Sequence, residues 1–321
     1  MKVAAGVDLQ IASDGGLRCW LDTDHARGWL TPAPGTARVV TPEQFARELS
    51  TASGEGFVDA DAAVLAMMRT HHPDELPLLS WDAQQPLAPA TPVAARRLDL
   101  YAIVESAARI EQVLTAGVKT VQLRIKTPDR PDEKWFDMLR GEIRRSIAAC
   151  AAGGAELFVN DHWQFAAEEG AGGVHLGQED LLALGDAGRA ALAATGMALG
   201  ISSHSLWELC RARTLHPRYV ACGPVWPTLT KAMPWRPQGL DNLAWWCRIA
   251  DVPVVAIGGI LGPEHVAQAA ASGADGVCIV RGLGERPQDV LPALQSALKA
   301  GRRDATKQPQ PAWPHPSLAN A

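Results

Sequence analysis

Acidic and amide side chains end two apolar runs in the middle of this chain, where they could bind a metal ion. The stretch GVHLGQEDLL, residues 173–182, alternates apolar residues with His175 and glycine, and then turns acidic at Asp180. The run ELFVND ends in Asn160 and Asp161. Such residues commonly cap helices by accepting hydrogen bonds from free backbone N–H groups. Two acids at neighbouring strand ends could instead share a Mg²⁺ ion, which takes one or two carboxylates together with phosphate and water oxygens.

A second group of polar residues supplies positive charge. In TVQLRIK, residues 120–126, the side chains of Gln122, Arg124 and Lys126 alternate with apolar residues and so point to one side of the predicted strand. An edge strand with solvated charges would explain them, but a closed barrel has no edge. Two cations on one face of a barrel strand are costly unless an anion meets them. The pattern therefore favours a phosphate or diphosphate clamp, in which Arg124 supplies a fork of donors and Lys126 a compact charge.

Glycines end two later apolar runs and predict a second anion site. AIGGI contains Gly258 and Gly259, and VRGLG contains Gly282. Bare backbone N–H groups at such strand ends form the usual phosphate cradle of barrels. An enzyme that joins a diphosphorylated molecule to a phosphorylated one would need two anion sites. Further polar residues follow two other runs: Ser202, Thr228, Thr230 and Lys231. Taken singly, each Ser or Thr is more often a turn residue than a ligand.

These residues need a scaffold that gathers strand ends, and the rhythm of the chain predicts one. Short β-branched runs alternate with Ala- and Leu-rich segments at helical spacing, and glycine follows several of those segments as it follows many helices. Eight repeats predict an α/β fold, a (βα)₈ TIM barrel with its functional groups at the carboxyl ends of the strands. An open doubly wound sheet is the alternative. The predicted strands are 100–104, 120–126, 156–161, 173–178, 198–202, 219–225, 253–260 and 276–282.

The composition of the chain changes on both sides of this repeat. The barrel is predicted over residues 98–300, and the Pro- and Ala-rich stretch 84–97 before it is typical of a linker. The Pro-rich stretch 301–321 predicts a disordered tail. Residues 1–83 are left as a small N-terminal extension.

Composition and charge exclude several other classes of protein. The chain has 321 residues, 47% of them apolar, and a net charge of −5 without a basic tail, which argues against a nucleic-acid partner. No apolar run is long enough to span a membrane, and the first residues, MKVAAGVDLQ, lack the long apolar stretch of a signal peptide. We therefore expect a cytoplasmic protein with no membrane partner. The six cysteines show no C-x-x-C pairing, which predicts buried, reduced thiols.

In their order along residues 98–300, the motifs resemble those of the thiamine-phosphate synthase family. LYAIV, QLRIK, FVND, GVHLGQEDL, LGIS, GPVWPTLTK, PQGL, PVVAIGGI and GADGV follow the family's sequence of motifs. The resemblance implies a transferase that condenses two small-molecule substrates, 4-amino-2-methyl-5-hydroxymethylpyrimidine diphosphate and 4-methyl-5-(2-hydroxyethyl)thiazole phosphate. The implied products are thiamine phosphate and pyrophosphate, and the implied cofactor is Mg²⁺.

The same resemblance implies a role for each matching residue. Asp161 and Asp180 would hold Mg²⁺, and Ser202 would lie near the breaking bond. The implied diphosphate ligands are Arg124, Lys126, Asn160 and Lys231. The implied pyrimidine pocket includes Gln122 and His175. The implied thiazole phosphate contacts are Gly259, the loop with Gly282, Thr228 and Thr230.

Some positions depart from the family's pattern. Glu105 stands where the family often has Asp, His162 where it often has Arg, and Arg281 where many relatives have a small residue.

The first of two alternative functions is a thiazole tautomerase, a related barrel that typically lacks the full QxRxK and GQED set. The second is a phosphate-binding regulator without catalytic activity, because sequence cannot prove turnover. Residues 1–83 loosely resemble the end of a hydroxymethylpyrimidine (phosphate) kinase without its Gly-Thr-Gly-Cys motif, which suggests a degenerate remnant or a docking segment. A homo-oligomer is a further expectation.

Overall fold

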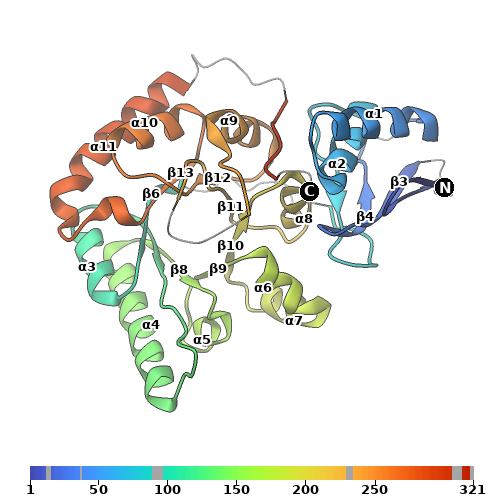
Figure 1. The fold of residues 1–321 in the computed structure, drawn as a ribbon. Coiled ribbons are helices and arrows are strands. Elements are labelled where there is room, and N and C mark those ends of the chain that lie inside the picture. The colour runs from blue at the N-terminus through green and yellow to red at the C-terminus, as the bar shows by residue number, and fades with distance from the viewer. Residues whose placement is uncertain (12–15, 37, 89–96, 229–233, 306–312, 319–321) are drawn as a thin grey trace.

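Eight parallel strands close into a barrel in the computed structural model (Figure 1). The structure describes residues 1–321 except 12–15, 37, 89–96, 229–233, 306–312 and 319–321. Each strand pairs with the next along the chain, and the last pairs with the first through Gly276 and Asp99. The barrel strands are β6 (Asp99–Val104), β7 (Thr120–Leu123), β8 (Glu156–Asn160), β9 (Gly173–Leu176), β10 (Ala198–Ser203), β11 (Tyr219–Cys222), β12 (Val254–Ala256) and β13 (Gly276–Ile279).

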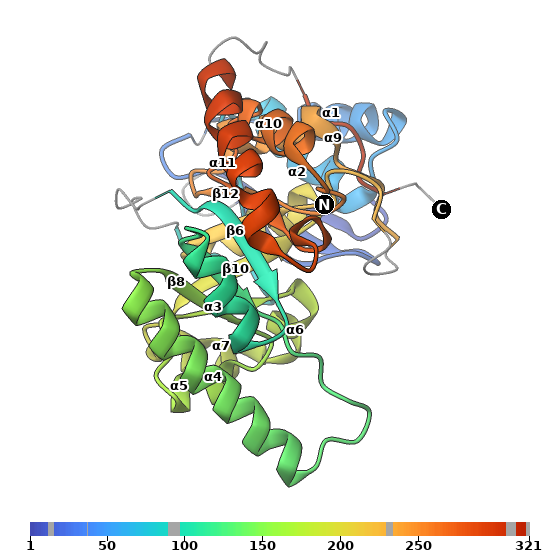
Figure 2. The same cartoon turned by 90° about the vertical axis from the view of Figure 1, so that its left-hand side faces the viewer.

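Helices cover the outside of the barrel, and Figure 2 shows α3, α4 and α11 along its wall. The barrel helices are α3 (Ala107–Thr115), α4 (Glu133–Gly153), α5 (Trp163–Glu168), α6 (Gln178–Ala183), α7 (Gly185–Ala194), α8 (Leu206–Arg213), α9 (Gly239–Ile249), α10 (Pro263–Ala271), α11 (Pro287–Asp304) and the 3₁₀ turn η1 (Arg281–Leu283). The prediction of a (βα)₈ barrel is therefore confirmed, and the open sheet is excluded.

Several strands are shorter than predicted, and the difference decides where the polar residues lie. The predicted strand 120–126 ends at Leu123, so Arg124 and Lys126 follow the strand in a loop. Likewise, 173–178 divides into a strand that ends at Leu176 and the helix α6, which begins at Gln178. Arg124 N still donates to Val104 O at 2.8 Å, so this side chain follows the strand end directly.

Helix ends follow from local chemistry. The carboxylate of Asp132 accepts a hydrogen bond from Trp135 N at 2.9 Å, which caps the start of α4. Gly154 ends the same helix with φ 58°, a left-handed conformation that glycine adopts without steric cost. The hydroxyl of Ser205 caps α8 in the same manner by accepting from Glu208 N at 3.3 Å. The two N-terminal caps lie at the carboxyl end of the barrel, where they fix the ends of the loops that follow β7 and β10, whereas Gly154 leads into the start of β8 at the opposite end.

The N-terminal extension is an ordered unit of its own. A five-stranded antiparallel sheet in the order β1 to β5 packs on two helices, and the blue ribbon of Figure 1 shows this unit beside α8. The unit joins the barrel through Asp61, whose carboxylate accepts from Trp207 N at 3.0 Å at the start of α8. Its elements are β1 (Lys2–Ala4), β2 (Val7–Ile11), β3 (Leu17–Asp22), β4 (Arg27–Thr31), α1 (Pro42–Gly54), α2 (Asp59–Thr70) and β5 (Leu78–Leu79).

The predicted disordered tail needs a correction. Helix α11 continues to Asp304, and residues 313–318 pack against the rest of the chain. The backbone of His315 exchanges two hydrogen bonds with the Asn242 side chain, at 2.8 and 3.0 Å, and the Arg69 guanidinium lies 5.0 Å from the ring of Trp313. A Pro-rich composition predicts disorder only where nothing binds the segment, and here a buried amide and an arginine do.

Two further expectations concern the thiols and the membrane. All six cysteines are free and five of them are buried, as predicted. Among the described residues, no helix combines the length and the apolar character that crossing a membrane requires.

Candidate active site

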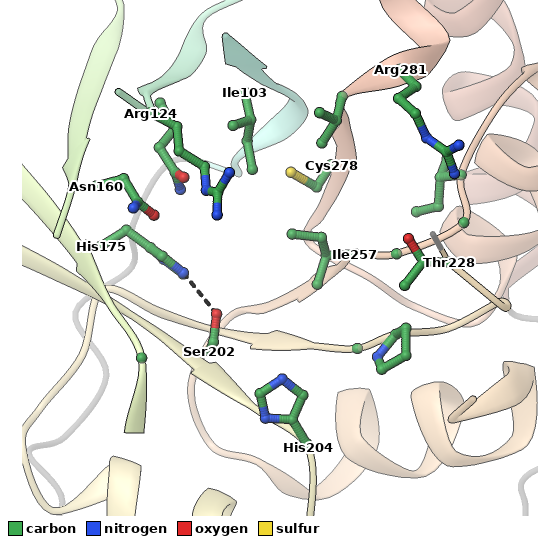
Figure 3. Close-up of a pocket in the computed structure, with 18 of the residues that line it drawn as sticks. Ile103, Arg124, Asn160, His175, Ser202, His204, Thr228, Ile257, Cys278 and Arg281 are labelled. Carbon is green, nitrogen blue, oxygen red and sulfur yellow. Dashed lines mark hydrogen bonds between the residues drawn. The ribbon is translucent and has the colours of Figure 1, made fainter. Parts of the chain in front are cut away.

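A cavity of about 540 Å³ opens at the carboxyl ends of the barrel strands (Figure 3). Its lining comes from residues that end a strand or follow one, which is where barrels carry their functional groups. Asn160, Arg124 and His175 lie on one side, and Thr228 and Arg281 lie on the other. Most predicted site residues line the cavity: Gln122, Arg124, Asn160, Asp161, His175, Asp180, Ser202, Thr228 and Gly259.

The remaining predicted residues lie elsewhere. Lys126 is exposed and does not line the cavity, because the strand ends three residues before it. Gly282 lies in η1, behind the lining residue Arg281. Thr230 and Lys231 fall outside the described residues.

The floor of the cavity is apolar. Ile103, Ile257 and Cys278 line it from three different strands or strand ends. Ile103 and Cys278 are buried, so these side chains offer a firm surface rather than a mobile one. A flat heteroaromatic ring could pack there between the polar groups on either side.

Two carboxylates, those of Asp161 and Asp180, line the cavity and lie close enough for their charges to interact. Asp161 follows β8 with φ 64°, a left-handed conformation that aspartate tolerates better than most residues. Asp180 lies in the first turn of α6, where its Oδ2 accepts from Gly177 N at 2.9 Å. Burial raises the pKa of Asp161, the negative charge of Asp180 raises it further, and Arg124 opposes the shift. A divalent cation between the two carboxylates would remove this repulsion.

These two acids fit Mg²⁺ better than a metal held by protein alone. Among the described residues, no three His, Cys, Asp or Glu side chains gather as a metal site. Mg²⁺ keeps several waters and is commonly bound by one or two carboxylates together with substrate phosphates. Arg124 lines the same cavity and could hold the phosphates that complete such a site.

The opposite side of the cavity is formed by backbone. Gly258 and Gly259 have φ values of 93° and 73°, which other residues rarely adopt. A Cβ atom on Gly258 would lie 2.6 Å from Pro224 Cβ, and one on Gly259 would lie 2.5 Å from Trp226 Cβ. Only glycine therefore leaves room here, and it exposes peptide groups that can bind a phosphate.

A chain of buried hydrogen bonds leads from inside the barrel to the cavity. Gln122 Nε2 donates to the Tyr101 hydroxyl at 3.1 Å, and the Tyr101 and Tyr219 hydroxyls lie 2.7 Å apart. The Tyr219 hydroxyl lies 2.7 Å from His175 Nδ1, and His175 Nε2 lies 2.8 Å from Ser202 Oγ. The imidazole of His175 also stacks on the Tyr219 ring. Ser202 is therefore held at the cavity wall by groups in the centre of the barrel.

The direction of donation along this chain follows from the amide of Gln122. The Gln122 amide donates to the Tyr101 hydroxyl, whose own proton then has the Tyr219 hydroxyl as its acceptor among the described residues, and Tyr219 in turn donates to His175 Nδ1. Burial lowers the pKa of His175 to about 4, with a smaller contribution from Arg124, so the ring is neutral. Its one proton is then on Nε2 and is donated to Ser202 Oγ. The Ser202 O–H consequently points away from His175 and can donate to a ligand.

Reasoning from the sequence missed several of these groups. Tyr101 and Tyr219 look like ordinary strand aromatics, and only closure of the barrel brings them together. His204 also lines the cavity, with Nδ1 3.0 Å from Glu208 Oε2 and its ring stacked on Trp235 at 5.0 Å. The spacing of His204 and Glu208, four residues apart at the start of a helix, is the signal that could have found this pair.

Known proteins are similar to this chain both in the sequence and in the fold of the barrel. The model of the family described as "Thiamine monophosphate synthase" matches residues 92–283. Proteins named thiamine-phosphate synthase are similar to this chain: one from Rhizobium etli is 47% identical over 193 residues, covering 60% of this chain and 90% of the relative. One from Neisseria meningitidis serogroup A is 44% identical over 202 residues, covering 62% of this chain and 94% of the relative.

A solved structure supports the fold. Thiamine phosphate pyrophosphorylase from Pyrococcus furiosus superimposes with a TM-score of 0.54 at 24% identity, covering 64% of this chain and 98% of that one. At this identity the likeness concerns the barrel alone. Since the family model spans more than half of the sequence, the chain belongs to the thiamine monophosphate synthase family.

Proposed function

We propose that this chain is a thiamine-phosphate synthase that condenses the pyrimidine diphosphate with the thiazole phosphate in the barrel cavity. The family and the relatives at 44% and 47% identity carry this activity in their names. The observation that carries the proposal is the arrangement of the cavity, in which two anion-binding sides flank an apolar floor. Two phosphorylated substrates need that arrangement, whereas a tautomerase, which acts on one substrate, does not.

The diphosphate would bind on the side of Arg124 and Asn160. The Arg124 guanidinium offers a fork of donors, and the Ser202 O–H is available for a further hydrogen bond to the departing oxygens. When bound by Asp161 and Asp180, Mg²⁺ would supply charge neutralisation to the leaving diphosphate. The aminopyrimidine ring would lie on the apolar floor.

The thiazole phosphate would bind on the opposite side, against the backbone of Gly258 and Gly259 with Thr228 and Arg281 nearby. Held there, the thiazole nitrogen faces the pyrimidine methylene carbon. The C–N bond forms as the C–O bond to the diphosphate breaks, and the electron pair leaves with pyrophosphate. No general base is needed, since the attacking nitrogen carries no proton, so the protein acts by positioning and by stabilising charge.

The carboxylate pair offers a direct test of the metal assignment. We expect Asp161→Asn and Asp180→Asn to weaken Mg²⁺ binding measured by calorimetry in the presence of pyrophosphate, and to lower the condensation rate. Asp241→Asn, which changes an exposed aspartate on α9, serves as a control with the same loss of charge. Equal Mg²⁺ affinity in all three variants would contradict the metal assignment.

A further inference from the structure

A second cavity, of about 380 Å³, lies between the N-terminal unit and the barrel. The turn between β3 and β4 and residues 81–82 form one wall, and residues of α6, α7 and α8 form the other. It shares no lining residue with the cavity described above. Its volume is in the range of pockets that hold small molecules.

Two buried guanidinium groups lie at the base of this cavity. Arg211 is 3% exposed and Arg189 is 8% exposed. Their Cζ atoms lie 4.6 and 5.0 Å from the ring centre of Trp81, which also lines the cavity. The aromatic ring and the neighbouring helices therefore hold both cations in fixed positions.

The two arginines differ in how their charge is balanced. Arg189 forms an ion pair with Asp186 and donates to Leu181 O at 2.8 Å. Arg211 donates from Nε and Nη2 to the neutral amide oxygen of Gln178, at 3.2 and 3.0 Å, and within the described parts of the chain it has no carboxylate within ion-pair distance. Burial lowers the pKa of Arg211 to about 10, so the group is still charged at neutral pH. The carboxylates of Glu208 and Glu179 offset part of this charge from beyond ion-pair distance, so the buried Arg211 guanidinium lacks only a directly bound anion.

The remaining donor of Arg211 is available to a ligand. Its Nη1 makes no hydrogen bond to any described residue, and this nitrogen is still reached by solvent. Since Arg211 lines the cavity, this donor is reached through it. We propose that the cavity binds a small phosphorylated molecule whose phosphate lies against Arg211 and Arg189.

The rim limits what can enter. Asp24, Asp82 and Asp186 line the cavity and are exposed, as is Arg27. Three carboxylates at the rim repel a large polyanion such as a nucleic acid. A single phosphate that reaches the base passes them, because Arg27 offsets part of their charge. The ligand is therefore a small phosphorylated molecule rather than a large polyanion.

Arg211 is not the best residue for a test. It anchors Gln178, the first residue of α6, two residues before Asp180 of the first cavity. Changing Arg211 would disturb both cavities. Arg27 instead is exposed, lines only the second cavity, and makes a long ion pair of 3.8 Å with exposed Asp22. Arg303 on α11 is a matched control, because it is exposed and lines neither cavity.

The experiment measures binding of inorganic phosphate to the full chain by isothermal titration calorimetry. Arg27→Glu and Arg303→Glu change the net charge equally. We expect Arg27→Glu to weaken one class of phosphate site by about tenfold or more, because a like charge at a binding site is strongly unfavourable. Arg303→Glu should match the wild type, and both variants should retain the condensation rate.

Two results would overturn the proposal. Identical phosphate binding in the wild type and both variants would show that Arg27 borders no phosphate site. Loss of all phosphate binding on Arg124→Ala would show that every site belongs to the first cavity. His25→Glu, at a second exposed lining residue, should reproduce the effect of Arg27→Glu, which guards against a local folding defect in one variant.

Discussion

The Tyr219 hydroxyl joins two halves of the buried hydrogen-bond chain, and its removal should be costly. Tyr219→Phe keeps the ring, so no cavity forms, but it leaves the Tyr101 O–H without an acceptor and His175 Nδ1 without a donor. All three residues are at most 6% exposed, so water cannot easily replace the hydroxyl. An unpaired buried polar group costs about 1–3 kcal/mol. Two such groups give an expected loss of about 2–6 kcal/mol in the free energy of unfolding.

Urea denaturation of the wild type, Tyr219→Phe and Tyr101→Phe checks this value. Tyr101→Phe should cost less, because Tyr219 can still donate to His175 and only the Gln122 amide loses its partner. The condensation rate should fall more for Tyr219→Phe as well, because Ser202 loses its orientation. A smaller loss of stability for Tyr219→Phe than for Tyr101→Phe would refute the proposed direction of donation.

Three further predictions concern the cavity and the N-terminal unit. Arg124→Lys keeps the charge but loses the two parallel N–H donors of the guanidinium, so the turnover number should fall about 100-fold with little change in KM for the thiazole phosphate. In steady-state kinetics, a raised KM with unchanged turnover would mean that Arg124 binds the thiazole phosphate instead. Gly259→Ala should raise the KM for the thiazole phosphate, because the new Cβ would clash with Trp226 and the left-handed backbone costs alanine about 1–2 kcal/mol. An unchanged KM would argue against phosphate binding at the backbone of Gly259. Burial raises the pKa of Asp61 to about 8, so the folded state favours its protonated form and the wild type should lose stability as pH rises from about 4 to about 8. In Asp61→Asn, the urea midpoint should no longer show the part of this decrease that comes from Asp61. Equal pH profiles of the urea midpoint in the wild type and in Asp61→Asn would contradict this assignment.

Some of the site was predictable because a barrel brings strand ends together wherever they stand in the sequence. The polar residues after β7, β8 and β9 could therefore be assigned to one cavity before any contact was known. Lys126 was misplaced because alternation in the sequence does not tell where a strand stops. The pair Tyr101 and Tyr219 is 118 residues apart, and nothing local in either strand predicts that the two hydroxyls meet.

The N-terminal unit shows a second limit of sequence reasoning. Its first four strands pair as consecutive hairpins and β5 pairs with β4 after the two helices. Its attachment to the barrel, however, depends on single contacts such as Trp81 Nε1 donating to Thr214 Oγ1 at 3.2 Å. Such contacts between distant residues carry no periodic signal. The cavity with Arg211 at its base exists only because the two parts meet there.

The central claim is that the barrel cavity joins two phosphorylated substrates with release of pyrophosphate. The direct measurement incubates the purified full chain with the pyrimidine diphosphate, the thiazole phosphate and Mg²⁺, and quantifies thiamine phosphate and pyrophosphate together. We expect equal amounts of both products, formed only when both substrates and Mg²⁺ are present, and a rate that Asp161→Asn greatly lowers. Pyrophosphate release without thiamine phosphate, or no reaction by the folded wild-type chain, would contradict it.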